Sequence, residues 1–300
     1  MSDKTLKARL AADEIVVAPG IYDAFTGLLV EQAGFDCAYL SGASLSYMRY
    51  GRPDIGLIGM REVADAVTAI RERIEIPLMV DGDTGYGNAL NVIRTVREFE
   101  RAGASAIQLE DQSLPKRCGH LAGKSLVSAD EMVGKIHAAL DTRRSEETLI
   151  VARTDAIAVE GFEAALDRGE RFVEAGCDMI FVEAPVDEEQ MRALNARFKG
   201  KAPTMANMVE GGSTPIKPSS ELSDLGYSFV IFPGGTGRTV AFALQEYFVG
   251  LKEHGTTDQA RNRMLDFTQF NHLIGTPEML DLGRSYDPHT VAKARTGADD

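Results

Sequence analysis

Short apolar runs alternate with longer amphipathic segments along most of the chain. Four of the runs come directly after a helix-like segment and a glycine: EQAGFDCAYLSG (31–42), ERAGASAIQLED (100–111), VEAGCDMIFVEA (173–184) and SDLGYSFVIFPG (223–234). Glycine at such a joint suits the left-handed residue that ends a helix, and the apolar run suits a strand buried on both faces. Each phrase therefore predicts a helix that leads into a buried strand.

Four further runs have the same length and ending: IVVAPG (15–20), IPLMVDGD (76–83), LIVARTD (149–155) and PTMANM (203–208). The segments between the runs, such as LNVIRTVREFERAG, carry apolar residues every three or four positions, which predicts helices. Eight strands that alternate with helices indicate a single (β/α)₈ TIM-type barrel domain, 1–300, with its site where the strands run into loops. A doubly wound open sheet is the alternative.

The chain beyond about residue 238 differs from this pattern. It is helical in character from 238 to 272 and becomes polar and irregular after Gly275. No linker rich in Pro, Gly or Ser divides the chain. We therefore expect a C-terminal helical extension, 238–300, that packs on the barrel or on a neighbouring subunit.

Composition and charge exclude several classes of protein. Hydrophobic residues make up 44% and charged residues 26%, as in globular proteins. A net charge of −13 argues against a nucleic-acid partner, which requires clustered cations. The first residues lack an apolar signal region and no stretch is long enough to span a bilayer, so we expect a cytoplasmic protein with no membrane partner. Its three cysteines should be thiols.

The stretch DGDTGYG (81–87) places Asp81 and Asp83 at the end of an apolar run. Oxygen ligands that leave room for water and substrate are those that Mg²⁺ prefers, with Mn²⁺ as an alternative. An Asp-Gly turn that caps the next helix explains the same residues equally well. Glu110, at the end of the following strand, favours the metal.

The stretch PKRCGH (115–120) should lie over the same mouth, because it follows Glu110 closely. Lys116, Arg117 and His120 would favour the thiolate of Cys118, so this cysteine is a candidate acid or base. A zinc site needs a second group of Cys or His ligands with suitable spacing, and the sequence has none. An ordinary surface turn is the remaining alternative.

Other strand ends carry charged or small residues. Arg153 and Glu183 each end an apolar run, so they either pair with each other or Arg153 receives a substrate carboxylate that Glu183 supports. SGAS (41–44) offers backbone N–H groups to a carboxylate. The glycine-rich stretches EGGSTP (210–215) and FPGGTGR (232–238) match neither phosphate-binding nor dinucleotide-binding patterns.

Taken together, six stretches of the sequence resemble the isocitrate lyase and phosphoenolpyruvate mutase superfamily over nearly the whole chain. They are YLSGAS (39–44), VDGDTGYGNALNVIRTV (80–96), IQLEDQSLPKRCGH (107–120), ARTDA (152–156), FVEAP (181–185) and ANMVEGGSTP (206–215). The KRCGH loop resembles the branch that breaks C–C bonds, whereas mutases that form phosphonates carry a loop without the cysteine. The first stretches look like methylisocitrate lyases and ANMVEGGSTP looks more like dialkylmalate lyases, so the substrate stays open.

The resemblance implies a Mg²⁺-dependent lyase that cleaves a small 2-hydroxy di- or tricarboxylate to pyruvate and a carboxylic acid. An oxaloacetate hydrolase or decarboxylase is the alternative on the same site. A phosphonate-forming mutase and a non-catalytic carboxylate-binding barrel are further alternatives. The resemblance also implies a homotetramer in which a C-terminal helix is exchanged between subunits.

The resemblance further implies roles for individual residues. Asp81 and Asp83 would hold the metal, with Glu110 and Asp54 around them, and Cys118 would deliver a proton to C3. Tyr39 is a candidate for the base that takes the hydroxyl proton, while Lys116, Arg117 and His120 would tune or position. The residues implied to bind substrate are Ser41, Gly42, Ala43, Asp54, Arg153, Glu183, Asn207 and Arg238.

Overall fold

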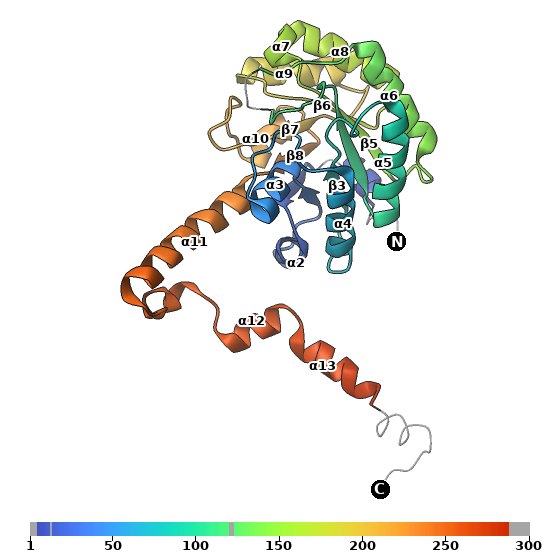
Figure 1. Ribbon diagram of the computed structural model, residues 1–300. Helices are drawn as coiled ribbons and strands as arrows, with labels where there is room; N and C mark the ends of the chain where they lie inside the picture. The colour runs from blue at the N-terminus through green and yellow to red at the C-terminus, as the bar shows by residue number, and fades with distance from the viewer. Residues whose placement is uncertain (1–4, 13, 120–122, 288–300) are drawn as a thin grey trace. The chain divides into compact units, whose positions relative to one another are not determined.

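The computed structural model describes residues 5–12, 14–119 and 123–287. Within them, eight parallel strands lie in the order β6-β5-β4-β3-β2-β1-β8-β7. A parallel bridge between Ile180 and Thr204 joins the two ends of this sheet, so it forms a nearly closed barrel surrounded by helices (Figure 1). The predicted (β/α)₈ barrel is confirmed, and the open-sheet alternative is wrong.

The strands coincide with the eight apolar runs. They are β1 (Val16–Ile21), β2 (Ala38–Leu40), β3 (Leu78–Asp81), β4 (Ala106–Glu110), β5 (Leu149–Thr154), β6 (Met179–Val182), β7 (Met205–Asn207) and β8 (Phe229–Phe232). Their side chains are almost all buried because one face meets the barrel interior and the other meets the helices.

The helices of the barrel are α1 (Leu6–Leu10), α2 (Ala24–Gln32), α3 (Gly42–Tyr50), α4 (Met60–Arg71), α5 (Ala89–Ala102), α6 (Ala129–Thr142), α7 (Ile157–Glu160), α8 (Phe162–Glu174), α9 (Glu188–Phe198) and α10 (Ser219–Asp224). The predicted joint glycines Gly34, Gly103, Gly176 and Gly226 all have φ between 85° and 104°. Only glycine adopts this conformation at little cost, which is why each helix stops there and a strand follows.

Two hydrophobic cores hold the barrel together. One packs the helices against the outside of the sheet, and the other fills the barrel interior with side chains such as Tyr39, Met79, Phe181 and Phe229. Leu6 of α1 joins the interior core and is 1% exposed. Because the interior is filled, the barrel leaves no room for a ligand inside it, and a site is expected where the strands end.

The chain divides into two compact units, Met1–Thr239 and Val240–Asp300. Helix α11 (Gly235–His254) runs from the first into the second, which also contains η2 (Asp258–Arg263), α12 (Phe267–Leu273) and α13 (Thr276–Ser285). The expected irregular stretch after Gly275 is therefore wrong as far as residue 285. Pro277 in the first turn and the apolar Met279, Leu280 and Leu282 favour a helix there.

No helix in the described part of the chain is both long and apolar enough to cross a membrane.

Candidate active site

The strand ends and the loops that follow them surround a cavity of about 60 Å³ at the mouth of the barrel. The sequence-predicted residues that line it are Tyr39, Ser41, Ala43, Asp54, Asp81, Glu110, Lys116, Arg117, Cys118, Arg153, Glu183, Asn207 and Arg238. Gly42 and Asp83 contact lining residues, and His120 lies outside the described residues. Cys118 lines this cavity, which favours the interpretation of its loop as part of the site over that of an ordinary surface turn.

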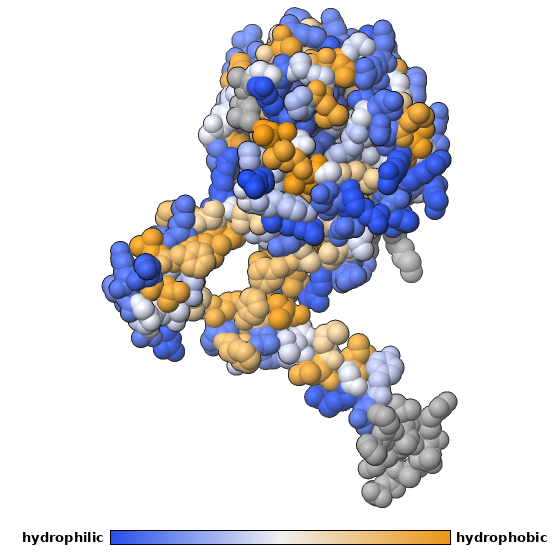
Figure 2. All heavy atoms as spheres, in the orientation of Figure 1, coloured by the Kyte–Doolittle hydropathy of each residue, from blue (hydrophilic) through white to orange (hydrophobic). Residues whose placement is uncertain are grey.

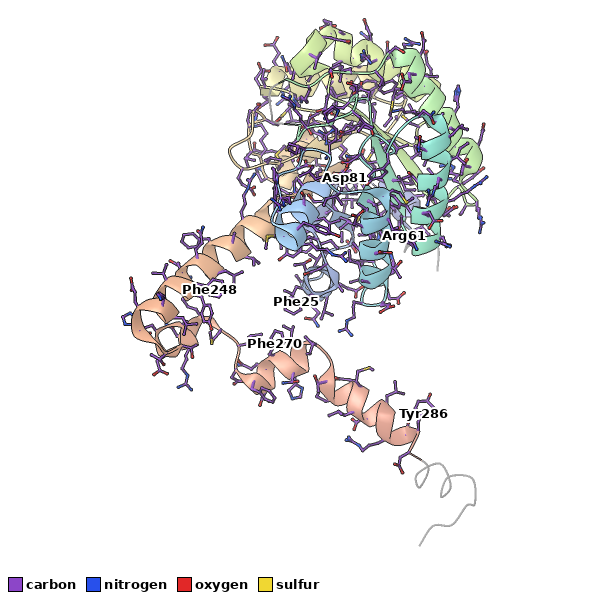
Figure 3. The ribbon with its side chains drawn as sticks, in the orientation of Figure 1. Phe25, Arg61, Asp81, Phe248, Phe270 and Tyr286 are labelled. Atoms are coloured by element: carbon purple, nitrogen blue, oxygen red, sulfur yellow. The ribbon has the colours of Figure 1, made fainter. Side chains whose placement is uncertain are left out.

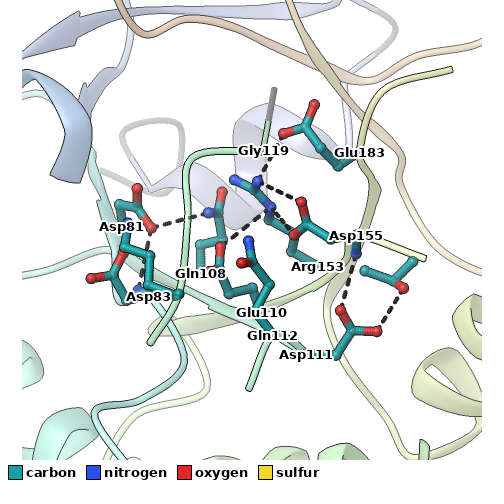
Figure 4. A network of polar contacts seen from close by, with 12 residues as sticks. Asp81, Asp83, Gln108, Glu110, Asp111, Gln112, Gly119, Arg153, Asp155 and Glu183 are labelled. Atoms are coloured by element: carbon teal, nitrogen blue, oxygen red, sulfur yellow. Dashed lines mark hydrogen bonds and ion pairs between the residues drawn. The ribbon is translucent and has the colours of Figure 1, made fainter. Parts of the chain in front are cut away.

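Asp81 ends β3 and is held by three donors. Its Oδ1 accepts hydrogen bonds from Gln108 Nε2 at 3.2 Å and from the backbone N–H of Asp83 at 3.3 Å, and its Oδ2 accepts one from the N–H of Gly42 at 3.3 Å. Ser41 caps the first turn of α3, which places Gly42 against this carboxylate. The donors fix the direction of Asp81, whose side chain Figure 4 shows beside Gln108.

Gln108 is a site residue that the sequence analysis missed. It is buried in β4 and its Oε1 accepts a hydrogen bond from the hydroxyl of Tyr39 at 3.3 Å. Burial and the nearby Asp81 raise the pKa of Tyr39 well above its usual value. The Tyr39 hydroxyl therefore keeps its proton at neutral pH, and the role of Tyr39 as a base stays a prediction. A buried glutamine in a strand was the available signal, because buried amides need partners.

Asp83 adopts a left-handed backbone conformation with φ 47°, so it leaves the line of the strand. Its Oδ1 lies 2.6 Å from Lys116 Nζ, and the same nitrogen lies 2.5 Å from Oδ1 of Asp54. Burial raises the pKa of Asp83 to about 7, although Lys116 opposes this rise. Burial alone would lower the pKa of Lys116, but the carboxylates of Asp83, Glu110 and Asp54 raise it well above its usual range.

The atoms near Asp81 that could bind a metal suit a hard cation. They are carboxylate oxygens, and Oε1 of buried Glu110 has no hydrogen-bond partner among the described residues. Within the same part of the chain, no group of three or more His, Cys, Asp or Glu side chains is arranged to hold a metal. One or two carboxylates completed by water and substrate oxygens are typical of Mg²⁺, so the residues fit this ion.

Arg153, at the end of β5, is surrounded by carboxylates (Figure 4). Its Nε lies 2.9 Å from Asp155 Oδ2 and 3.4 Å from Glu110 Oε2, and its NH2 lies 3.1 Å from Glu183 Oε2. The structural pairing of Arg153 with Glu183 is therefore observed, and the guanidinium still lines the cavity. Asn207 donates to Glu183 Oε2 at 3.0 Å and fixes its position.

Arg238 is the last residue of the glycine-rich stretch 232–238. It lies in a helix and not in a strand-end loop. It belongs to the first turn of α11, because the helix begins at Gly235. Its NH1 donates to the side chain of Glu210 at 2.9 Å and to the backbone oxygen of Glu210 at 2.7 Å. Arg238 therefore reaches the cavity already paired with an acid.

The cysteine loop, defined here as 114–125, is attached to the barrel at several points. Gln112 exchanges two hydrogen bonds with the backbone of Arg117, at 2.8 and 2.9 Å. The N–H of Cys118 donates to the backbone oxygen of Asp54 at 3.2 Å. These bonds hold the loop in place beside the cavity that Cys118 lines.

Apolar residues complete the lining, and the sequence analysis did not single them out. They are Tyr47, Val209, Ile231 and Pro233. Nothing in their sequence context separates them from core residues, since apolar residues line pockets and cores alike.

A barrel with a buried acidic mouth and a cysteine loop above it defines a class of enzyme that handles small, oxygen-rich ligands. The family model described as phosphoenolpyruvate phosphomutase matches residues 6–251. The chain belongs to this phosphoenolpyruvate mutase and isocitrate lyase family, as the sequence motifs predicted.

Two relatives cover almost the whole chain. The 2,3-dimethylmalate lyase of Eubacterium barkeri is 43% identical over 281 residues, 94% of this chain and 96% of the relative. The 2-methylisocitrate lyase of Aeropyrum pernix is 46% identical over 270 residues, 90% of this chain and 86% of the relative.

Solved structures agree with the fold. A structure of oxaloacetate acetylhydrolase in complex with the inhibitor 3,3-difluorooxalacetate has a TM-score of 0.89 at 31% identity, covering 95% of this chain and 96% of that one. A phosphonopyruvate hydrolase in complex with oxalate and Mg²⁺ has a TM-score of 0.86 at 29% identity, with 95% and 99% covered. That family member therefore binds a divalent metal together with a small carboxylate.

Proposed function

We propose that this protein is a Mg²⁺-dependent carbon–carbon lyase of 2-hydroxy di- or tricarboxylic acids, of the 2,3-dialkylmalate or 2-methylisocitrate type. The observation that carries the proposal is that Cys118, Arg153 and the carboxylates Asp81 and Glu110 line one cavity. A thiol in this position is suited to proton transfer, and the relatives named as lyases support the same chemistry.

In this proposal Asp81 and Asp83 would hold Mg²⁺, directly or through water, with Asp54 and Glu110 around them. Mn²⁺ is the alternative ion. When bound, the metal supplies positive charge that stabilises the negative charge developing on the substrate's 2-oxygen. It also offsets the chain's net charge of −13, which would otherwise repel an anionic substrate.

The substrate's C1 carboxylate would lie at the start of α3, beside Ser41, Gly42 and Ala43. The N–H of Ser41 already donates to the backbone oxygen of Ile21 and the N–H of Gly42 to Asp81 Oδ2, so the substrate would take its backbone hydrogen bond from Ala43. A helix N-terminus favours an anion because its first N–H groups lack partners within the helix. Arg153 would assist from the end of β5, with Glu183 and Asn207 holding it in place. Arg238 is positioned to meet the far end of the substrate.

The bond-breaking step begins when a base takes the proton of the 2-hydroxyl. Tyr39, the candidate from the sequence, would fill this role only in its deprotonated form, which its raised pKa disfavours. The C2–C3 bond then breaks, its electron pair goes to C3, and C2 becomes the ketone carbon of pyruvate. Cys118 gives its proton to C3, which leaves a thiolate that water or a nearby group reprotonates. Lys116, Arg117 and His120 would stabilise that thiolate or position the loop.

Oxaloacetate hydrolysis or decarboxylation is the second candidate function. It is favoured by the similarity to oxaloacetate acetylhydrolase, whose ligand is also a short dicarboxylate. The phosphonate-forming mutase is less well supported because Cys118 occupies the loop. A non-catalytic carboxylate-binding barrel would leave the thiol without a purpose.

The C-terminal unit supports the proposed homotetramer with an exchanged helix. It exposes many large apolar side chains, among them Phe242, Phe248, Phe267, Phe270, Met279, Leu280 and Tyr286. Phe248 belongs to α11, Phe270 to α12, and Tyr286 follows the end of α13 (Figure 3). The space-filling view shows apolar side chains along this unit (Figure 2). Apolar surface on this scale is typical of subunit interfaces. The three cysteines are free thiols, which suits the proposed cytoplasmic location.

A substrate screen tests the function. Pyruvate release is measured from 2,3-dimethylmalate, 2-methylisocitrate and oxaloacetate, each with Mg²⁺ and with EDTA. We expect Mg²⁺-dependent pyruvate from one of the first two. Oxalate or CO₂ released from oxaloacetate alone would establish the second candidate, and tight oxalate binding without any turnover would establish the non-catalytic one.

A further inference from the structure

Lys124 and Asp155 form a buried ion pair. Lys124 Nζ lies 2.9 Å from Asp155 Oδ1, and the two side chains are 2% and 0% exposed. Neither residue lines the cavity. A buried pair loses much of its Coulombic gain to desolvation, so its presence calls for an explanation other than stability.

Lys124 also contacts the cysteine loop. Its Nζ donates to the backbone oxygen of Gly119, the residue that follows Cys118. A single ammonium group therefore connects the peptide next to the thiol with a carboxylate that follows β5. Lysine suits this task because it offers three donors on a flexible stem.

Asp155 is shared between Lys124 and Arg153. Its Oδ1 accepts from Lys124 and also from Arg153 NH2 at 3.1 Å, and its Oδ2 accepts from Arg153 Nε at 2.9 Å. The carboxylate thus joins Lys124 to the guanidinium of Arg153, and Figure 4 shows the Asp155–Arg153 half of this link. Lys124 and Arg153 hold the pKa of Asp155 at about 2, although burial alone would raise it.

Gly119 and Arg153 are in direct contact as well. A Cβ on Gly119 would lie 2.4 Å from Arg153 NH2 and 2.8 Å from Glu183 Oε2. The loop backbone therefore rests on the Arg153–Glu183 pair. Its distance from the cavity depends on the hydrogen bonds that attach the loop to the barrel. Lys124 provides one such hydrogen bond, to the residue next to Cys118.

We propose that Lys124 is a positioning residue that acts through Asp155 and the Gly119 backbone. It holds Cys118 over the cavity and at the same time fixes the carboxylate that orients Arg153. The consequence for catalysis rests on the proposed function, whereas the consequence for the loop does not.

The position of the loop is tested by the rate at which a thiol reagent reacts with the protein. Cys37 and Cys177 are 0% and 7% exposed, so iodoacetamide labelling of the folded protein, followed by mass spectrometry, reports on Cys118. Lys124→Met removes the charge and keeps the length of the side chain. We expect about 10-fold faster labelling, with Lys124→Arg close to wild type. Lys201→Met, which breaks an exposed ion pair with Glu170, is the matched control and should change nothing.

Turnover provides the second readout. On the substrate found in the screen, Lys124→Met should lower kcat by about 10-fold or more, and Lys124→Arg should recover most of the loss. If Lys124→Met melts below the assay temperature, Lys124→Gln, which keeps one donor, takes its place with the same expectations.

The outcomes separate the two proposals. Unchanged labelling in Lys124→Met, or equal effects of Met and Arg, would overturn the role of Lys124. Faster labelling in Lys124→Met, rescued by Arg, in a protein that cleaves none of the substrates would support that role and reject the lyase.

Discussion

Gly119 lies against Arg153 so closely that any side chain at position 119 would displace one of them. The added Cβ would stand 2.4 Å from Arg153 NH2, and Glu183, which is held by Asn207, limits movement of the guanidinium. Gly119 is therefore needed because its backbone lies against Arg153, and not because the loop hinges there. The position of the neighbouring Cys118 depends on this close contact.

Gly119→Ala should consequently damage activity more than stability. The methyl group would lift the loop, and misplacing a reacting group by about 1 Å costs about 100-fold in rate. We expect kcat/KM to fall by about this factor while the melting temperature stays within a few degrees.

Gly134→Ala is the matched control for this substitution. Gly134 lies exposed in the middle of α6, and nothing lies within 4 Å of an added Cβ. Alanine there should stabilise the helix by about 0.5–1 kcal/mol and leave activity unchanged. Equal activity in both glycine variants would show that the loop tolerates a wider spacing from Arg153.

Cys118→Ser tests the thiol as the proton donor. The serine hydroxyl is a far weaker acid, so C–C cleavage should slow by about 100-fold or more. Binding of oxalate, measured by calorimetry, should change little because Cys118 is not assigned to hold the C1 carboxylate. A cleavage rate within about threefold of wild type would remove Cys118 from the mechanism.

Asp83→Asn tests the metal site. The substitution keeps the shape of the side chain and removes one charge, and Lys116 retains Asp54 as a partner at 2.5 Å. We expect Mg²⁺ affinity, measured by calorimetry on the resting protein, to fall by at least about 10-fold. Asp141→Asn, on the exposed end of α6, is the control. If both variants bind Mg²⁺ like wild type, the ion is held elsewhere.

Asp111 gives stability a pH dependence that can be measured. Its Oδ2 accepts from Thr154 Oγ1 at 2.6 Å and its Oδ1 from the N–H of Asp155 at 3.0 Å. Burial nevertheless raises the pKa of Asp111 from 3.8 to about 6. Between about pH 4 and 6 the folded state holds a proton that the unfolded state has lost, so stability falls as pH rises through this window.

Asp111→Asn should remove this dependence, because an amide does not ionise. Two pKa units correspond to about 2–3 kcal/mol. The free energy of unfolding of the variant, relative to that of wild type, should therefore rise by up to this amount from pH 4 to pH 7. Urea unfolding at several pH values measures the difference, with the exposed Asp224→Asn as control. A constant difference across the range would contradict the raised pKa.

The family and fold could be predicted because their signals are local. Each joint glycine, such as Gly103 with φ 104°, ends its helix for a steric reason that holds in any context. The length of each apolar run limits the length of the strand that it forms. The same locality explains the error after Gly275, where polar residues on one face of α13 hid an amphipathic helix.

The sequence by itself therefore determined eight strands, their barrel and the residues at the strand ends. Only the tertiary structure decided that Arg153 pairs with Glu183, that Lys116 bridges Asp54 and Asp83, and that Lys124 reaches Asp155. These contacts join segments that are distant in sequence. In water a charged side chain is solvated instead of paired, so the folded structure decides which partner it meets when both are buried.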